Sequence, residues 1–246
     1  MITLYQFEIS PFCDKIRRIL QVKRVPYTVR NVRMTETATT LRKVNPIGKV
    51  PCIDDGGHLV ADSTDIAHYL EERYPEPRLI PTAPRERALC HMLEDWADES
   101  LYFYEVQMRF GFPTNRKQTV DKLIKDEPAL IRTVAPLVIP SMMKRVGQQQ
   151  GVGRKPDAVV VRDVERHADA VQGWLEGGEW LVGDALSLAD IAVFAQLSCI
   201  RETQEGTRVM AARPALTRWM ERVDAATAGA PATDAEAPGR ASARTA

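Results

Sequence analysis

The sequence predicts two domains, a small α/β domain followed by an all-helical domain. Three observations support this division. The first 30 residues carry a strand–helix–strand pattern, which favours a parallel strand pair joined by a right-handed crossover. Residues 74–84 contain four prolines and predict a stiff linker. No convincing strand pattern follows that linker, so the rest of the chain is expected to be helical.

The first elements are defined by the spacing of apolar side chains. Residues 2–7 alternate and predict a strand. Residues 11–20 place apolar side chains at helical spacing, so they predict a helix with one buried face. Residues 25–30 predict the second strand of the βαβ unit.

The remaining elements of this domain are separated by turn signals. A short helix over residues 39–44 is expected to end at residues 45–48, because proline and glycine stop a helix. Strands over 49–53 and 58–61 form an antiparallel hairpin around Asp-Asp-Gly-Gly. A helix begins at Asp62, a good N-cap residue. Residues 1–75 therefore predict the order β-α-β-α-β-β-α.

The second domain is expected to span residues 85–223. A long helix should cover 85–110, and a weaker helical stretch should cover 121–132, with boundaries disturbed by nearby prolines. Residues 147–156, rich in Gly, Gln and Lys, predict an exposed loop. A helix over 157–174 follows.

The C-terminal part begins with a strong helix-start signal. Ser187 and Asp190 form the pattern of a capping box, so a buried helix is expected through Ile200. Residues 213–223 predict a last amphipathic helix. The Ala-, Thr-, Pro- and Gly-rich segment 225–246 predicts a disordered tail.

Composition excludes several classes of function. The chain has 246 residues, of which 44% are hydrophobic and 27% charged, with a formal net charge of zero. Zero net charge gives no indication of nucleic-acid or membrane binding, and no apolar run reaches the roughly 20 residues of a membrane span. The first residues carry no basic region and no long apolar run, so no signal peptide is expected. The spacing of the four cysteines fits neither a zinc site nor a disulfide scaffold, so no metal is expected. Reduced cysteines are typical of the cytoplasm, so a cytoplasmic location is expected.

The helix that follows the first strand begins with Ser10-Pro11-Phe12-Cys13. Ser10 suits the N-cap and Pro11 suits the first helical position. A hydroxyl and a thiol therefore lie at the positive end of a helix, which stabilises anions and lowers the pKa of a nearby thiol. Taken alone, the pattern is more typical of an ordinary helix cap and a buried core cysteine than of a functional site.

Four motifs in this order resemble the cytosolic glutathione S-transferase family, of the theta- and delta-like Ser-x-x-Cys type and bacterial-like. They are Ser10-Pro11-Phe12-Cys13, residues 45–51 ending in Val50-Pro51, Asp62-Ser63, and the capping box of Ser187 to Asp190. The resemblance covers about residues 1–223. It implies a thioredoxin-like domain followed by a helical domain, with glutathione as co-substrate.

The resemblance also assigns roles to individual residues. Pro51 would be a cis-proline that turns the Val50 backbone toward the cysteinyl part of glutathione. Asp62 and Ser63 would bind the γ-glutamyl group at a helix N-terminus. Lys49 either balances the glycyl carboxylate or is a solvated loop residue.

The catalytic assignment lies between Ser10 and Cys13. A serine hydroxyl can stabilise the glutathione thiolate by hydrogen bonding, which prepares it to attack an electrophilic carbon. Related cysteine-type enzymes place Cys at the position of Ser10 and favour thiol reduction. We expect Ser10 to stabilise the thiolate and Cys13 to lie behind it. The main hypothesis is a transferase acting on a small apolar electrophile, with detoxification as its role.

Two alternatives remain open at this point. The first is a glutathione-dependent reductase or dehalogenase that uses Cys13. The second is a non-catalytic binding protein, which the proline-rich middle segment would support by covering the electrophile site. Family resemblance further implies a homodimer. The candidates for the electrophile site share the long helix of the second domain: Trp96, Tyr102, Phe103, Tyr104 and Met108.

Overall fold

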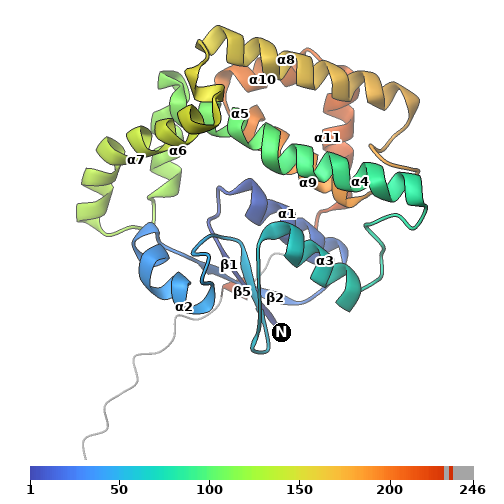
Figure 1. The fold of residues 1–246 in the computed structure, drawn as a ribbon, viewed down its shortest axis with the longest axis horizontal. Helices are drawn as coiled ribbons and strands as arrows, with labels where there is room; N and C mark the ends of the chain where they lie inside the picture. The colour runs from blue at the N-terminus through green and yellow to red at the C-terminus, as the bar shows by residue number, and fades with distance from the viewer. Residues whose placement is uncertain (230–232, 235–246) are drawn as a thin grey trace, which may run out of the picture.

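The α/β domain predicted for the N-terminal end is present in the computed structural model, which describes residues 1–229 and 233–234 (Figure 1). Its elements are β1 (Ile2–Gln6), α1 (Pro11–Val22), β2 (Tyr27–Asn31), η1 (Met34–Glu36), η2 (Thr37–Leu41), α2 (Arg42–Val44), β3 (Cys52–Asp55), β4 (His58–Ala61) and α3 (Ser63–Arg73). The predicted order β-α-β-α-β-β-α is confirmed, and with it the thioredoxin-like fold.

The sheet has the strand order β4-β3-β1-β2-β5. β1 and β2 pair in parallel, as the short helical crossover between them predicts. β3 pairs antiparallel with both β1 and β4, so the hairpin is added on the other side of β1. Helix α1 packs between α3 of its own domain and α9 of the helical domain.

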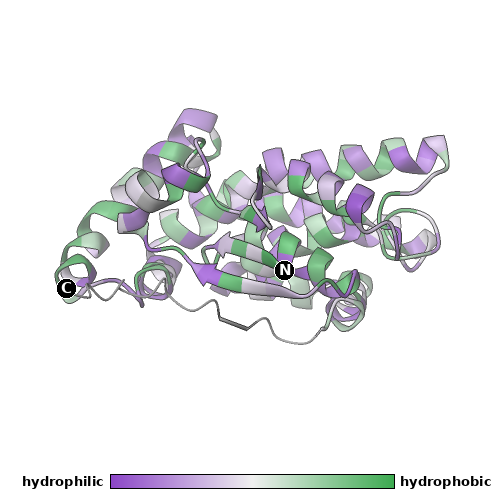
Figure 2. Ribbon diagram, turned by 90° about the horizontal axis from the view of Figure 1, so that it is seen from below, coloured by the Kyte–Doolittle hydropathy of each residue, from purple (hydrophilic) through white to green (hydrophobic). Residues whose placement is uncertain are grey.

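The helical domain begins directly after the proline-rich linker. Its elements are α4 (Pro84–Trp96), η3 (Ala97–Leu101), α5 (Tyr102–Val106), η4 (Gln107–Gly111), α6 (Pro113–Leu123), α7 (Ala129–Gln150), η5 (Val152–Arg154), α8 (Asp157–Trp174), η6 (Leu175–Gly177), α9 (Leu188–Arg201), α10 (Gln204–Ala211) and α11 (Pro214–Ala226). The segments α4 to η4 form one continuous helix over residues 84–111, as predicted. Hydrophilic and hydrophobic residues alternate along the helices, as expected for helices buried on one face (Figure 2).

Two predictions for the middle of the chain are wrong. Residues 124–128 break the helix expected over 121–132, so that α6 ends at Leu123 and α7 starts at Ala129. The loop expected over 147–156 is largely helical, because α7 continues to Gln150 and η5 follows. Pro136 and Pro140 lie inside α7 without ending it. Pro136 is exposed, so solvent can bond to the backbone carbonyl that it leaves unpaired.

The C-terminal segment returns to the first domain. α11 runs to Ala226, beyond the predicted helix end, and β5 (Thr233–Asp234) pairs in parallel with β2. Part of the segment expected to be disordered is therefore a strand. The rest of that prediction, on residues 230–232 and 235–246, lies outside the described residues.

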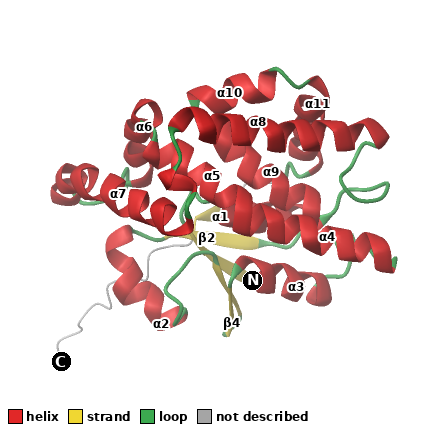
Figure 3. Ribbon diagram, turned by 45° about the horizontal axis from the view of Figure 1, so that its top comes forward, coloured by secondary structure: helices red, strands yellow, loops and turns green. Residues whose placement is uncertain are grey.

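The arrangement in Figure 3 places the helices α4 to α11 over one side of the sheet, with α1 and α9 at the contact. Along α9 almost every side chain is buried, as the apolar run after Ser187 predicts. Among the described residues, no helix combines the length and apolar character needed to cross a membrane.

Candidate functional site

Three segments of the first domain meet at one edge of the sheet. The strand register places Tyr5 of β1 opposite Cys52 of β3, and Cys52 opposite Ala61 of β4. Ser10 follows the end of β1, Val50 precedes the start of β3, and Ser63 follows the end of β4, all on the same side of this row of paired residues. The structure therefore gathers the three predicted motifs at the same edge.

Ser10 caps the N-terminus of α1. Its backbone is extended, and its hydroxyl oxygen accepts a hydrogen bond from the Cys13 backbone N–H at 3.4 Å. The hydroxyl proton is not used by this bond and can be donated either to the Cys13 sulfur or to a ligand. The preceding carbonyl, of Ile9, accepts from Arg109 Nη1 at 3.0 Å, which ties the start of α1 to the helical domain.

Cys13 lies in the core of the first domain and has no exposed surface. Burial raises the pKa of its thiol to about 11, although the hydrogen bond with Ser10 and the charge of Arg17 act in the opposite direction. The helix N-terminus therefore does not produce a thiolate here, because desolvation outweighs it. Cys52, Cys90 and Cys199 are also buried.

The Val50–Pro51 peptide bond is cis. The side chain of Asn45, a buried residue, hydrogen-bonds to the loop that precedes this bond. In the sequence, Asn45 indicates only the end of a helix. The Asn45 side chain donates to the Lys49 carbonyl at 2.7 Å and accepts from the Ile47 N–H at 2.9 Å. Asn45 thus fixes the backbone that presents Val50, while the Lys49 side chain is exposed.

Asp62 and Ser63 form the start of α3. Asp62 has φ = 79°, a left-handed conformation that costs energy for a residue with a Cβ, and its side chain caps the Thr64 N–H at 2.9 Å. Such strain is concentrated at ligand sites. Ser63 is buried, and its hydroxyl donates to Asp98 of the helical domain at 3.4 Å.

A buried ionic cluster lies beneath Ser63. Lys15 of α1 is 1% exposed, and its ammonium group contacts Glu94 at 2.7 Å and Asp98 at 2.5 Å. Thr64 also donates to Glu94, at 2.7 Å. We call these residues the Lys15 cluster, namely Lys15, Ser63, Thr64, Glu94 and Asp98. The cluster joins the first domain to the helical domain, and the sequence indicates it only by a lysine within the buried face of α1.

The Lys15 cluster holds two carboxylates against one ammonium group. Burial raises the pKa of Asp98 to about 6, with the charge of Glu94 adding to the rise, while Lys15 opposes it. The folded protein therefore binds the Asp98 proton more tightly than the unfolded chain does.

The consequence is a pH-dependent stability. The contribution of Asp98 to the free energy of unfolding is fully present below about pH 4 and is lost as the pH rises through about 6. Between pH 5 and pH 7 it should fall by about 1 kcal/mol, and Asp98→Asn should remove this part of the slope. Urea unfolding of both proteins at pH 5, 6 and 7 measures the difference, and parallel curves for the two would refute it.

The aromatic candidates of the long helix divide into two groups. Tyr102 packs against Phe12, with ring centroids 4.9 Å apart, and Phe103 contacts Tyr102. Tyr102 lies beside the start of α1, whereas Phe103 packs against the main core. Tyr104 and Met108 are buried in the core, and Trp96 packs on His167 of α8. Of these five candidates, Tyr102 is thus the one that contacts the start of α1.

The loop between α6 and α7, residues 124–128, bridges the two domains near Ser10. Glu127 is buried and accepts from the Met34 N–H at 2.5 Å and the Thr35 hydroxyl at 3.1 Å. Lys125 forms an ion pair with Glu8. We call this segment the bridging loop. It closes the region between the start of α1 and the β2–α2 connection.

Apolar side chains fill the space behind the bridging loop. This second hydrophobic cluster contains Ile9, Met34, Tyr102, Val106, Phe110, Val120, Leu123, Ile124, Ala135, Ile139 and Met143. The bridging loop itself contributes Ile124 to this cluster.

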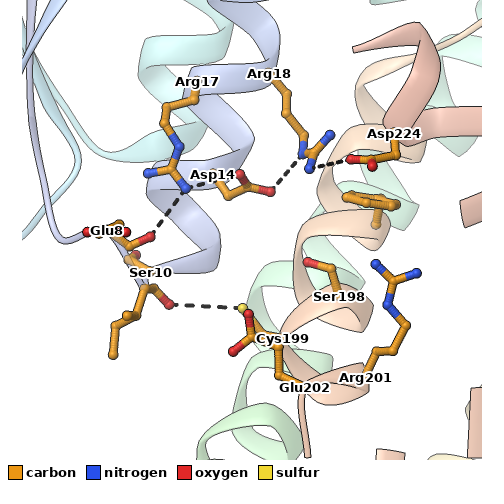
Figure 4. Close-up of a pocket in the computed structure, with 12 residues that line it drawn as sticks. Glu8, Ser10, Asp14, Arg17, Arg18, Ser198, Cys199, Arg201, Glu202 and Asp224 are labelled. Carbon is orange, nitrogen blue, oxygen red and sulfur yellow. Dashed lines mark hydrogen bonds and ion pairs between the residues drawn. The ribbon is translucent and has the colours of Figure 1, made fainter. Parts of the chain in front are cut away.

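A cavity of about 370 Å³ opens between α1 and α9 (Figure 4). Of the predicted site residues, only Ser10 lines it. The acidic and basic side chains within it largely pair with one another, as Asp14 does with Arg18 at 2.7 Å and Asp224 with Arg18 at 2.9 Å. The cavity is therefore separate from the segments that carry Val50 and Ser63. Among residues 1–229 and 233–234, no group of three or more His, Cys, Asp or Glu side chains is arranged to hold a metal ion.

The comparisons with known proteins agree with this geometry. A family model described as "Glutathione S-transferase, N-terminal domain" matches residues 4–78, and one described as "Glutathione S-transferase, C-terminal domain" matches residues 133–226. Together these two models span most of the chain and both of its domains.

The individual relatives differ in kind: some are described as glutathione S-transferases and one is described as an FtsZ-localized protein. FtsZ-localized protein A of Caulobacter vibrioides is 28% identical over 202 residues, covering 80% of this chain and 76% of that protein. Glutathione S-transferase omega-1 of Mus musculus is 32% identical over 88 residues, which are 35% of this chain and 37% of that protein. The solved structure of a glutathione S-transferase from Rhodospirillum rubrum F11 is 26% identical, with a TM-score of 0.66, covering 91% of this chain and 88% of that one.

Proposed function

The chain belongs to the glutathione S-transferase family, and on this premise we propose that it is a glutathione-dependent transferase whose Ser10 hydroxyl holds the glutathione thiolate. The observation that carries the proposal is the place of Ser10 at the N-terminus of α1, where its hydroxyl oxygen accepts from the Cys13 N–H and leaves the hydroxyl proton for a second bond. The positive end of the helix favours the thiolate, and the donated hydrogen bond favours it further. The thiolate then forms the new sulfur–carbon bond while the leaving group departs with its electron pair.

The other parts of glutathione would bind to the neighbouring segments. The Val50 backbone, turned outward before the cis bond to Pro51, would pair with the cysteinyl part as an added strand. The γ-glutamyl carboxylate would lie at the N-terminus of α3 at Ser63, and Asp62 would accept from the amine. The exposed Lys49 would face the glycyl carboxylate.

Burial of Cys13 argues against a reductase or dehalogenase that uses this residue. A thiol with a pKa of about 11 is protonated at neutral pH, and a side chain without exposed surface cannot meet a disulfide. Cys13 would then only shape the helix behind Ser10.

The bridging loop limits the second substrate. Its contacts with Glu8, Met34 and Thr35 cover the region next to Tyr102, so we infer a small electrophile rather than a large one. Family membership also supports a cytoplasmic homodimer with a role in detoxification.

A second candidate function is a non-catalytic binding protein built on the same fold. Two observations favour it: the bridging loop covers the electrophile region, and one relative over most of the chain is a protein described as localized with FtsZ. In that case, glutathione bound at the site would stabilise the protein and would not be turned over.

The experiment that tests the main proposal compares Ser10→Ala with Cys13→Ala. Loss of one hydrogen bond to a charged sulfur should lower kcat/KM for 1-chloro-2,4-dinitrobenzene about 10- to 100-fold in Ser10→Ala. Cys13→Ala should change it less than about threefold, since Cys13 is inside the core. The ultraviolet absorbance of bound thiolate should be lost only in Ser10→Ala.

Other outcomes separate the rivals. A large loss in Cys13→Ala alone, with the fold intact by circular dichroism, would assign the chemistry to the cysteine. Retention of the unaltered protein on immobilised glutathione without any conjugation would favour the non-catalytic binding protein.

A further inference from the structure

Helix α7 carries an unusual exposed apolar face. Most helices of this domain bury their apolar side chains, but α7 buries only Ile139 and Gly147 over its 22 residues. The exposed side chains follow the helical spacing i, i+4, i+7, i+8 and i+12, so they lie along one face. We call this face the α7 stripe; its members are Leu130, Val134, Leu137, Val138 and Met142.

The degree of exposure is large for aliphatic side chains. Leu130 is 74% exposed and Leu137 is 78% exposed. In Figure 2, where α7 lies at the left as in Figure 1, much of this outlying helix is coloured as hydrophobic. Single exposed leucines are ordinary, but a continuous row of them marks a surface that another molecule covers.

The charged side chains of α7 itself are all basic, and the nearest exposed acidic side chain along the chain is Asp126, four residues before Leu130. Residues 128–156 contain five Lys or Arg and no Asp or Glu, in a chain whose net charge is zero. Lys144 lies seven residues after Leu137, and Arg145 lies seven residues after Val138, so both side chains share the face of the stripe. Both are exposed, and neither has a side-chain partner among the described residues.

We propose that the α7 stripe binds an acidic amphipathic segment of another protein, which presents apolar side chains to the stripe and Asp or Glu side chains to Lys144 and Arg145. Burial of the apolar row supplies affinity, and the opposite charges fix orientation and increase the rate of association. The prediction is independent of glutathione binding, because none of the stripe residues lies in the Ser10, Val50 or Ser63 segments.

The charge pattern decides between this occupant and a second copy of the chain. Two α7 helices packed face to face in parallel would bring Lys144 and Arg145 of the two copies together, and such like-charge contacts oppose association. In an antiparallel pair, only Asp126 of each copy would lie near the two basic side chains of the other. The basic excess of the stripe therefore favours an acidic partner over a second copy.

The side-chain chemistry also decides against a lipid surface. Helices that lie in a membrane interface usually combine Trp or Phe with many Lys and Arg. The α7 stripe has no aromatic member, and only Lys144 and Arg145 share its face.

The test uses the full chain and a fluorescein-labelled synthetic peptide of about 20 residues, with Leu at helical spacing and Glu at the flanking positions. Its binding is measured by fluorescence anisotropy. Leu137→Gln should weaken binding at least about tenfold. The double variant Lys144→Glu with Arg145→Glu should weaken it about tenfold or more and reduce its dependence on salt.

Matched controls lie on other helices. Met92→Gln alters a 69% exposed apolar residue of α4, and Arg218→Glu reverses an exposed charge of α11. Neither should change peptide binding more than twofold, since neither residue lies on α7. All variants should keep the circular dichroism spectrum and the urea unfolding midpoint of the unaltered protein, which shows that they are folded.

Four results would overturn the proposal. The first is absence of binding to the Glu peptide. The second is equal binding to a peptide in which Lys replaces every Glu. The third is binding to phosphatidylglycerol vesicles in place of the peptide. The fourth is a change of oligomeric state in Leu137→Gln, seen by sedimentation velocity, which would assign the stripe to a second copy of the chain.

Discussion

Replacing Lys15 with methionine is expected to lower the free energy of unfolding by about 3–5 kcal/mol. Lys15 is buried and is the ammonium group that meets both Glu94 and Asp98. Methionine fills the same space without a charge, so the two carboxylates would repel each other in a region that water does not reach. Removal of one partner from a buried ion pair has this cost because the other charge stays uncompensated.

Urea unfolding followed by circular dichroism measures the effect. The matched control is Lys117→Met, which removes the same group from an exposed pair with Asp121 on α6. This control should cost less than about 1 kcal/mol, because exposed ion pairs contribute little. Equal losses in the two variants would show that burial of the Lys15 cluster does not govern its energy.

The loss in Lys15→Met should depend on pH. Lys15 lowers the pKa of Asp98, so its removal raises that pKa above about 6. Protonation of Asp98 then relieves the repulsion at lower pH. The difference between Lys15→Met and the unaltered protein should therefore be smaller at pH 5 than at pH 8.

The second large effect is expected at Asp190, where substitution by alanine should cost about 3–5 kcal/mol. The Asp190 carboxylate is fully buried at the start of α9. It accepts from the Ser187 N–H at 3.0 Å and its hydroxyl at 2.6 Å, from the Leu181 N–H at 2.8 Å and from the Trp219 indole at 2.9 Å. Alanine would leave these donors buried without partners, each at a cost of about 1–3 kcal/mol before relaxation.

Two comparisons isolate this cause. Ser187→Ala removes the N-cap but leaves Asp190 bound to Leu181 and Trp219, so it should cost only about 1–2 kcal/mol. Near-ultraviolet circular dichroism and tryptophan fluorescence should change in Asp190→Ala, because Trp219 loses its acceptor. If Ser187→Ala lowered the free energy of unfolding as much as Asp190→Ala does, the capping box alone would account for the stability at the start of α9.

Much of the fold was predictable because its signals act within a few residues. Ser10, Asp62 and Ser187 each cap a helix through a bond to a backbone group two or three residues away. Because both partners of such a bond lie within a few residues, the local sequence pattern predicts it. The same is true of the βαβ unit and the hairpin, and so the order of elements in the first domain was predicted correctly.

The errors arose where local signals conflicted with packing. Pro128, Pro136 and Pro140 all predict interruptions; the break at residues 124–128 includes Pro128, but α7 continues through Pro136 and Pro140. Helix α10, which is short and capped by Thr203, was not predicted. Its bounds depend on contacts with α9 and α11 and not on a strong apolar period.

The sequence by itself determined the order of the elements in the first domain, the capped starts of α1, α3 and α9, and the segments that carry Ser10, Val50 and Ser63. Only the tertiary structure decided the state of these groups. Lys15 meets Glu94 across 79 positions of the chain, and Glu127 meets Met34 across 93. Burial of Cys13 and closure by the bridging loop are likewise products of domain packing. Desolvation and long-range pairing depend on which surfaces face each other, and no short stretch of sequence contains that information.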